Sequence, residues 1–493
     1  MPTQVPLASI AQIRALEARA IAELDGDAFA LMQRAGRSAW DHARIHFPGA
    51  RRWIVCCGTG NNGGDGYLLA VHAARAGIEV RLLRTGEPAT VEAARAAAEC
   101  AAASIPMSLF EGDPLPAGDL LIDAVLGIGI KEAPRADTAR LIDAINVHAA
   151  TVYSLDVPSG LDADRGCAPG RCVEAAHTLT FLARKPGLLT GAGSCCSGEV
   201  SLADLGVTFV ADQGAGSISL LTGRAADALP LRRPDDHKGR YGRALLIGGD
   251  HGMGGAIALA GEACARVGAG VTSVATRGMH VGALLARRPE LMVHGDEDGD
   301  DHTAADEALL ERANVIGIGP GLGQAEWGRR WMQSALASNA VRVFDADALN
   351  SLAANPVRLR PDDVITPHPG EAARLLGCTA SDVENDRISA ARELANRFGA
   401  ICVLKGAGTV IADPDGRVAL SPHAVPALAT AGSGDVLTGI ITGLRAQGID
   451  AWHAACIGVL AHAECGLHAS ARHGARGVLA GDLAAYLPIV LNR

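Results

Sequence analysis

Short apolar runs alternate with amphipathic stretches along most of the chain, and this alternation stops and restarts once. In the first half, residues 52–57, 80–83 and 151–155 have the length and composition of buried strands, and helical stretches separate them. This order is typical of parallel sheets with helices on both faces. A Gly- and Pro-rich stretch at residues 211–239 interrupts the order, which resumes with a strand at residues 244–247.

The chain's 493 residues exceed what one hydrophobic core usually holds. Hydrophobic residues make up 48% of the chain and aromatic residues only 3%, so we expect cores of Ala, Val, Leu and Ile. We therefore predict two α/β domains, residues 1–218 and 219–493, with the boundary near Ser219.

Composition excludes several classes of function. The formal net charge is -10 and no long run of Lys or Arg occurs, which argues against nucleic-acid binding. The N-terminal residues suggest a helix capped by Ser9 rather than a signal peptide, and no apolar stretch reaches the length of a membrane span. The 12 cysteines fit no disulfide framework, so we expect reduced thiols and a cytoplasmic protein, although Cys167 and Cys172 leave a metal site open.

The strongest local motif is the glycine-rich loop from Gly58 to Gly66, between a predicted strand and a predicted helix. Glycines allow a ligand to approach the backbone, and the N–H groups at a helix start attract phosphate. The loop is neither a dinucleotide GxGxxG fingerprint nor a Walker A motif. It therefore predicts an anion site at the carboxyl end of a parallel strand, with a plain tight turn as the alternative.

Acidic and polar residues follow two further strands of the first half. Asp123 and Asp156 each end a predicted strand, and Ser159 comes shortly after the second one. Asn62 of the glycine-rich loop, Asp123 and Ser159 offer hard oxygen ligands that suit a cation. Helix capping is the simpler alternative for Asp123 alone.

The strings GNNGGDGYLLA, DAVLGIG, DVPSGLDAD and LARKPGLL resemble NAD(P)H-hydrate epimerases over roughly residues 9–210. The resemblance implies a Rossmann-like doubly wound fold and the interconversion of the R and S hydrates of NADH and NADPH. The resemblance implies that the substrate's phosphates contact Asn61, Asn62, Gly63, Gly64 and Asp65, and that a K⁺ ion is held by Asn62, Asp123 and Ser159. It implies further substrate contacts at Gly127, Ile128, Gly129, Ile130, Lys131, Glu132 and Ala133. It also implies an acid–base role at the reacting carbon for Asp156. Ile128 departs from the family pattern, in which Thr is expected.

In the second half, Gly432-Ser433-Gly434-Asp435 opens an apolar helix. A Gly-x-Gly turn at a helix start presents N–H groups and a positive dipole end to an anion, such as a phosphoryl group. Asp435 could accept a proton from a substrate hydroxyl. The alternative is that Ser433 caps the helix and Asp435 only interacts with its dipole.

The strings HKGRYG, GPGLG, TPHPGE, LKGAGTVI and AGSGDVLTG resemble ADP/ATP-dependent NAD(P)H-hydrate dehydratases of ribokinase-like fold, over roughly residues 225–490. The resemblance implies nucleotide binding by Lys405, Gly406, Ala407, Gly408, Thr409 and Gly434, and hydrate binding by Ala256, Gly321, His368 and Asp435. It implies phosphorylation of the ring hydroxyl followed by elimination, with ADP as donor, AMP and phosphate as products, and Mg²⁺ as cofactor. Asp345, Asp347 and Glu371 are candidates to orient Mg²⁺, whereas His423, His453, His462 and His468 are interpreted as structural or surface residues.

The leading hypothesis is a bifunctional repair enzyme with catalytic residues Asp156 and Asp435, acting on hydrated NADH and NADPH. One alternative is a ribokinase-like kinase of a small alcohol or vitamin precursor, which would stop at the phosphorylated product. Another is a first half that binds nucleotides without catalysis. The family resemblance also implies a homo-oligomer.

Overall fold

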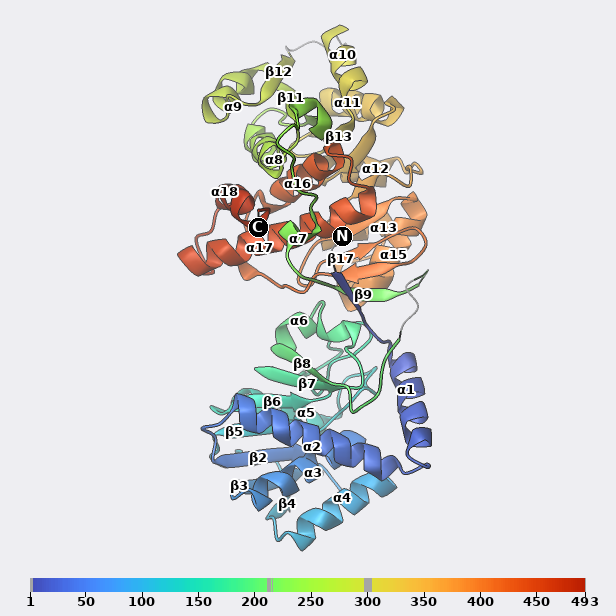
Figure 1. Cartoon of the computed structure of the whole chain (residues 1–493), viewed down its shortest axis with the longest axis vertical. Coiled ribbons are helices and arrows are strands. Elements are labelled where there is room, and N and C mark those ends of the chain that lie inside the picture. The colour runs from blue at the N-terminus through green and yellow to red at the C-terminus, as the bar shows by residue number, and fades with distance from the viewer. Residues whose placement is uncertain (1–2, 211–213, 215, 297–303, 493) are drawn as a thin grey trace. The chain divides into compact units, whose positions relative to one another are not determined.

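The computed structural model describes residues 3–210, 214, 216–296 and 304–492. The chain forms two compact units, Pro6–Gln213 and a second unit that combines Met1–Val5 with Gly214–Arg493 (Figure 1). This division differs from residues 1–218 and 219–493 in two places. The expected boundary at Ser219 falls inside strand β9 (Ile218–Thr222), and the N-terminal strand β1 (Thr3–Pro6) joins the sheet of the second unit beside β9.

The first unit is built on a parallel sheet of seven strands in the order β4-β3-β2-β5-β6-β7-β8. Its strands are β2 (Arg52–Cys57), β3 (Glu79–Arg84), β4 (Met107–Leu109), β5 (Leu120–Ala124), β6 (Thr151–Leu155), β7 (His177–Phe181) and β8 (Glu199–Ala203). Its helices are α1 (Ile10–Glu23), α2 (Ala28–His46), α3 (Asn61–Arg75), α4 (Val91–Ala102), α5 (Ala136–Asn146) and α6 (Gly193–Cys196). Ser9 caps α1, as predicted, through a capping box with Gln12.

Helices cover both faces of this sheet, which confirms the doubly wound prediction. Trp53 and Val55 of β2 pack in one hydrophobic cluster with α2, α3 and α4, while Ile54 and Cys56 pack on the other face against α5. The strand order reverses between β2 and β5. Ligands of open α/β sheets bind at such a switch point, beyond the carboxyl ends of the strands.

The second unit is built on an 11-stranded sheet in the order β1-β9-β18-β17-β16-β15-β14-β13-β10-β11-β12. Its remaining strands are β10 (Arg243–Ile247), β11 (Val271–Arg277), β12 (Met292–Asp296), β13 (Val315–Ile318), β14 (Val341–Phe344), β15 (Val364–Ile365), β16 (Ile401–Leu404), β17 (Val410–Ala412) and β18 (Val418–Leu420). The strands from β16 to β12 run parallel, whereas β17 is antiparallel to both its neighbours.

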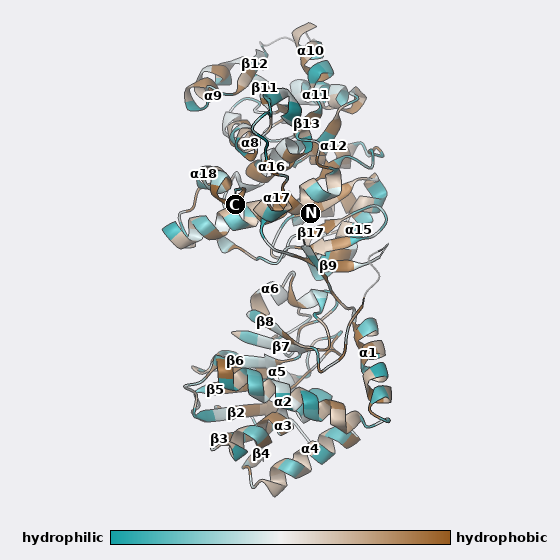
Figure 2. Cartoon of the chain, viewed as in Figure 1, coloured by the Kyte–Doolittle hydropathy of each residue, from teal (hydrophilic) through white to brown (hydrophobic). Residues whose placement is uncertain are grey.

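The helices of the second unit are α7 (Ala225–Ala228), α8 (Gly254–Val267), α9 (Val281–Arg287), α10 (Ala304–Arg312), α11 (Glu326–Ala337), α12 (Ala346–Ala354), α13 (Pro369–Leu376), α14 (Ala380–Asn385), α15 (Arg387–Phe398), α16 (Ser433–Ala446), α17 (Ala451–His473) and α18 (Ala480–Val490). Helices α8, α16 and α17 share one large hydrophobic cluster with the sheet, and α16 carries many hydrophobic residues (Figure 2). Helices α8 and α16 pack so closely that a Cβ atom on Gly439 would lie 2.2 Å from the Ala260 carbonyl oxygen. Within the described ranges, no helix is long and apolar enough to span a membrane.

Candidate active sites

The glycine-rich loop of the first unit lies at the switch point of its sheet. The Gly58 N–H donates to the Ala124 carbonyl at 3.0 Å, which joins the ends of β2 and β5. Helix α3 then begins at Asn61, and Gly63 touches the loop so closely that a Cβ atom there would lie 2.1 Å from the Gly58 oxygen. The start of α3 therefore faces the carboxyl edge of the sheet, where its N–H groups favour an anion.

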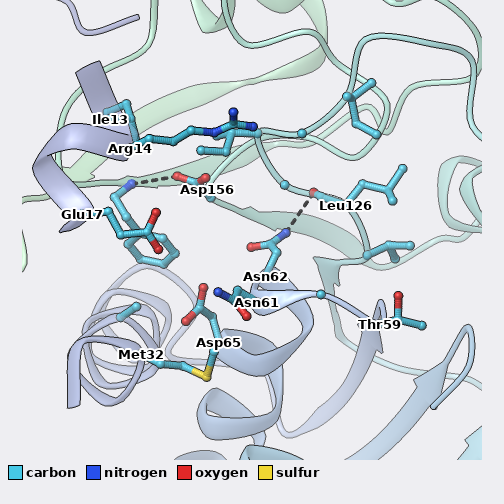
Figure 3. A pocket seen from close by; sticks show the side chains of 18 of the residues that line it. Ile13, Arg14, Glu17, Met32, Thr59, Asn61, Asn62, Asp65, Leu126 and Asp156 are labelled. Carbon is cyan, nitrogen blue, oxygen red and sulfur yellow. Dashed lines mark hydrogen bonds between the residues drawn. The ribbon is translucent and has the colours of Figure 1, made fainter. Parts of the chain in front are cut away.

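A cavity of about 1050 Å³ opens at this edge (Figure 3). Of the residues expected to bind substrate, it is lined by Asn61, Asn62, Asp65, Gly127, Ile128, Gly129, Ile130, Lys131, Glu132, Ala133 and Asp156. Gly63 and Gly64 do not line it; both are buried in α3. Ile128 has no hydroxyl group, and its side chain packs against two hydrophobic clusters instead.

The three residues expected to hold K⁺ lie together beside the cavity. Asp123 is fully buried and accepts hydrogen bonds from the Ser159 hydroxyl at 2.5 Å and the Ser154 hydroxyl at 2.8 Å. Asn62 donates to the Leu126 carbonyl at 2.9 Å, while its Oδ1 atom is buried with no hydrogen-bond partner among the described residues. Burial raises the pKa of Asp123, against the hydrogen bonds from Ser159. An unpartnered oxygen beside a buried carboxyl is a donor set that fits a cation.

Asp156 is held in a strained backbone conformation at the centre of this site. Its φ of 64° is unusual for a residue other than glycine, and such strain gathers at functional positions. Its carboxylate accepts a hydrogen bond from the Lys185 ammonium at 2.5 Å, drawn as a dashed line to Asp156 in Figure 3. Lys185 is fully buried and also donates to the Thr180 hydroxyl and the Phe181 carbonyl.

Two further carboxyl groups, Glu17 of α1 and Asp65 of α3, line the cavity with Asp156 (Figure 3). Burial and the charge of Asp156 raise the pKa of Glu17, and they raise the pKa of Asp65 well above its usual value. The pocket thus holds two carboxyl groups with raised pKa values beside the ion pair of Asp156 and Lys185. Sequence analysis missed Glu17, which lies on an amphipathic helix, and gave Lys185 no role within the LARKPGLL string.

The second unit gathers a charged centre at the carboxyl ends of its parallel strands. The Lys405 ammonium lies 2.6 Å from Asp345 and 3.8 Å from Glu371, and the Thr438 hydroxyl donates to Asp345 at 2.7 Å. Burial lowers the pKa of Lys405, but Asp345 and Glu371 outweigh this effect, so the pKa is raised overall. These contacts connect the ends of β14 and β16 with the start of α13 and with α16.

Asp435 and Gly434 lie at this centre. Burial, reinforced by Asp345, raises the pKa of Asp435 to about 7. A Cβ atom on Gly434 would lie 3.2 Å from the Lys405 ammonium, so the first turn of α16 lies directly beside that cation. The cap of α16 is Gly432, with a φ of 87° and no side-chain capping bond, so Ser433 does not cap the helix.

The residues expected to bind the hydrate lie along the same sheet edge. Gly321, with a φ of 59°, follows β13, and a Cβ atom on it would lie 3.4 Å from the Cβ of Ala256. His368 caps α13 after β15, and its backbone N–H donates to the Glu371 carboxylate at 2.7 Å. Glu371 in turn lies beside Lys405, which connects His368 to the charged centre.

The loop from Lys405 to Thr409, expected to bind the nucleotide, is supported by a residue that sequence analysis missed. Arg387 is fully buried and donates to the carbonyls of Leu404 at 3.3 Å and Lys405 at 3.1 Å. Gly406, with a φ of 134°, lies so close that a Cβ atom would be 2.9 Å from the guanidinium group. Within the loop, the Thr409 hydroxyl donates to the Gly406 carbonyl at 3.1 Å.

Two units with separate sites, one at the switch point of a doubly wound sheet and one beside a Gly-x-Gly helix start, define an α/β enzyme that handles phosphorylated metabolites. A family model described as NAD(P)H-hydrate dehydratase matches residues 244–489, and a YjeF-related N-terminal family matches residues 28–187. A ribokinase-like superfamily protein from Enterococcus faecalis is 29% identical, with a TM-score of 0.51, over 58% of this chain and 98% of that one. The second unit therefore has the expected ribokinase-like fold.

Curated relatives extend over nearly the whole chain. The bifunctional NAD(P)H-hydrate repair enzyme of Escherichia coli is 44% identical over 94% of this chain and 90% of its own length. The enzyme of the same name from Coxiella burnetii is 41% identical over 98% of both chains. The chain belongs to the family of bifunctional NAD(P)H-hydrate repair enzymes.

Proposed function

We propose that this chain repairs hydrated NADH and NADPH at two sites. The unit at Pro6–Gln213 interconverts the R and S hydrates, and the unit that contains Gly214–Arg493 dehydrates the S hydrate with ADP, giving AMP and phosphate. The observation that carries the proposal is the presence, in one chain, of a pocket lined by Asp156 and a second centre where Lys405 lies beside the first turn of the helix that carries Asp435. A kinase of a small alcohol would leave the first site without a role.

Inversion at a hydroxyl-bearing carbon next to the ring nitrogen can proceed when the hydroxyl leaves as water and water adds to the opposite face, which requires an acid for the departing hydroxyl and a base for the attacking water. Asp156, held by Lys185 at 2.5 Å, is suited to take the proton of the attacking water. Asp65 and Glu17, whose pKa values are raised, are suited to give a proton to the departing hydroxyl. The start of α3 would hold the phosphates, and bound K⁺ would neutralise charge beside them.

Dehydration begins, in this proposal, when Asp435 takes the proton of the ring hydroxyl. The hydroxyl oxygen accepts the terminal phosphoryl group of ADP, and AMP leaves. The C–O bond then breaks, phosphate leaves with the bonding electrons, and loss of a ring proton restores the double bond. Lys405 and the first turn of α16 stabilise the phosphoryl charge.

Mg²⁺ would neutralise the phosphate oxygens of the bound nucleotide. Over the ranges that the structure describes, no group of three or more His, Cys, Asp or Glu side chains is arranged to hold a metal. The charged centre around Lys405 and Asp435 therefore fits a Mg²⁺ ion held mainly by phosphate oxygens and water, with Glu371 or Asp345 as an outer contact. Asp347 instead accepts a hydrogen bond from the Gly323 N–H at 2.9 Å.

The most direct test supplies the purified S hydrate with ADP or ATP and identifies the products. The proposal expects reduced nicotinamide nucleotide, AMP and inorganic phosphate with ADP. A stable phosphorylated hydrate, or a phosphorylated small alcohol formed in preference, would favour the kinase alternative.

We expect epimer exchange, but not dehydration, to depend on K⁺. Ser154 donates to Asp123 and orients it, so Ser154→Ala should raise the K⁺ concentration needed for half-maximal exchange by roughly 10- to 100-fold. The measurement is epimer exchange by NMR during a K⁺ titration at constant ionic strength. Ser108→Ala, at an exposed position of β4, is the matched control. Exchange at full rate without K⁺ would contradict the cation assignment.

Dehydration should also depend on pH through Asp435. A carboxyl group with a pKa of about 7 loses its proton as the pH rises through 7, and only the carboxylate can act as a base. We therefore expect kcat/KM for dehydration to fall roughly tenfold between pH 8 and pH 6. A profile that is flat over this range, measured with saturating ADP and Mg²⁺, would exclude Asp435 as the base.

We further propose that the protein is cytoplasmic and that, as the family resemblance implies, it forms homo-oligomers. None of its twelve cysteines, all within the described ranges, forms a disulfide bond. Reduced thiols are typical of the cytoplasm.

A further inference from the structure

The hydroxyl of Ser433 lies at the first turn of α16, where it could occupy the proposed phosphate site. Serine hydroxyls readily bond to nearby backbone N–H groups at helix starts. The first N–H groups of a helix have no partner within the helix, and those of Gly434 and Asp435 lie in the first turn beside Lys405. Nevertheless, the N-cap residue of α16 is Gly432, where no side-chain capping bond forms.

A histidine from another helix holds this hydroxyl. The Nε2 atom of His462, on α17, lies 3.0 Å from the Ser433 Oγ atom. Both residues are buried, with exposed fractions of 8% for His462 and 6% for Ser433. Burial lowers the pKa of His462 to about 4, so at neutral pH the ring is uncharged and can form a hydrogen bond of either polarity.

We propose that His462 is a positioning residue of the dehydratase site, which keeps the N–H groups of Gly434 and Asp435 open to a phosphoryl group by holding the Ser433 hydroxyl. The inference rests on the proposed nucleotide site. A buried hydroxyl that loses its partner must find another one, because an unsatisfied polar group is costly. The next two residues of the chain, Gly434 and Asp435, carry first-turn N–H groups that have no partner within α16, so without His462 the hydroxyl competes with the phosphate for them.

The test is a double-mutant cycle on the full chain, with ADP affinity measured by calorimetry in the presence of Mg²⁺. His462→Ala is expected to raise the Kd for ADP roughly 5- to 30-fold. On the Ser433→Ala background, where no hydroxyl competes, the same substitution should change the Kd by less than about twofold. His462→Gln, whose amide can still hold the hydroxyl, should restore most of the affinity.

The control is His468→Ala on the same helix, where an exposed ring stacks on Tyr486 with 5.8 Å between centroids. It should bind ADP as the unaltered chain does. If His462→Ala weakens ADP binding equally on both backgrounds, His462 acts only through packing and the inference is overturned. If Lys405→Ala leaves ADP binding intact, the proposed nucleotide site itself fails, and the inference fails with it. Thermal unfolding of each variant, together with ADP binding by His462→Gln, shows whether a loss of ADP affinity is instead caused by a loss of folding.

Discussion

Replacing Asp435 with Asn is expected to stop dehydration while leaving epimer exchange unchanged. The side chain keeps its shape, but an amide cannot take the proton of the ring hydroxyl. Removal of a positioned acid–base group typically lowers the rate by roughly 10²- to 10⁴-fold. Because burial and Asp345 both disfavour the charged form of Asp435, the neutral amide should not destabilise the site.

The rate is measured as the return of reduced-nicotinamide absorbance from S hydrate with ADP and Mg²⁺. Asp415→Asn, at an exposed position after β17, is the matched control and should dehydrate at the normal rate. A loss of less than about tenfold in Asp435→Asn would mean that another group accepts the proton.

Replacing Asp156 with Asn should have the opposite effect to Asp435→Asn: epimer exchange should be lost and dehydration kept. Exchange between the R and S hydrates should fall by roughly 10²- to 10⁴-fold, because the base at the reacting carbon is lost. Asn is the appropriate substitution, since it tolerates the φ of 64° better than most residues and leaves the backbone in place. Dehydration of pure S hydrate should proceed at the rate of the unaltered chain.

Epimer exchange is measured by NMR, and the background of spontaneous exchange is subtracted. Asp113→Asn, at an exposed loop position of the same unit, should exchange normally. If Asp156→Asn still exchanges at the normal rate, the pocket binds the hydrate without using Asp156 as the base, and Asp65 or Glu17 would have to be tested in its place.

Local pattern was sufficient for most of the fold. The alternation of apolar runs and helical stretches predicted both sheets, because buried parallel strands need continuous apolar residues. The pattern could not place Thr3–Pro6, which is only four residues long and has no periodicity of its own. Its partner β9 begins more than 200 residues later, and only the finished fold brings the two strands together.

The sequence pattern predicted part of each candidate site, because it located the ends of the parallel strands. Residues at strand ends meet at one edge of their own sheet because parallel strands place their carboxyl ends together, as Asp123 and Asp156 do in the first unit and Asp345 and Lys405 do in the second. Residues that act from elsewhere gave no comparable pattern. Glu17 lies on an amphipathic helix, and His462 lies within a long apolar helix. From the sequence alone, each is therefore interpreted as a surface or structural residue until its neighbours are known.

The central claim, that one chain repairs both hydrates, is tested most directly with a mixture of R and S NADH hydrates, Mg²⁺, K⁺ and ADP. The return of reduced-nicotinamide absorbance should reach the total hydrate added, faster than spontaneous epimer exchange allows. With Asp156→Asn, rapid recovery should stop at the S fraction, and with Asp435→Asn it should not begin. Recovery that stops at the S fraction in the unaltered chain would contradict the epimerase assignment, and no recovery at all would contradict the whole account.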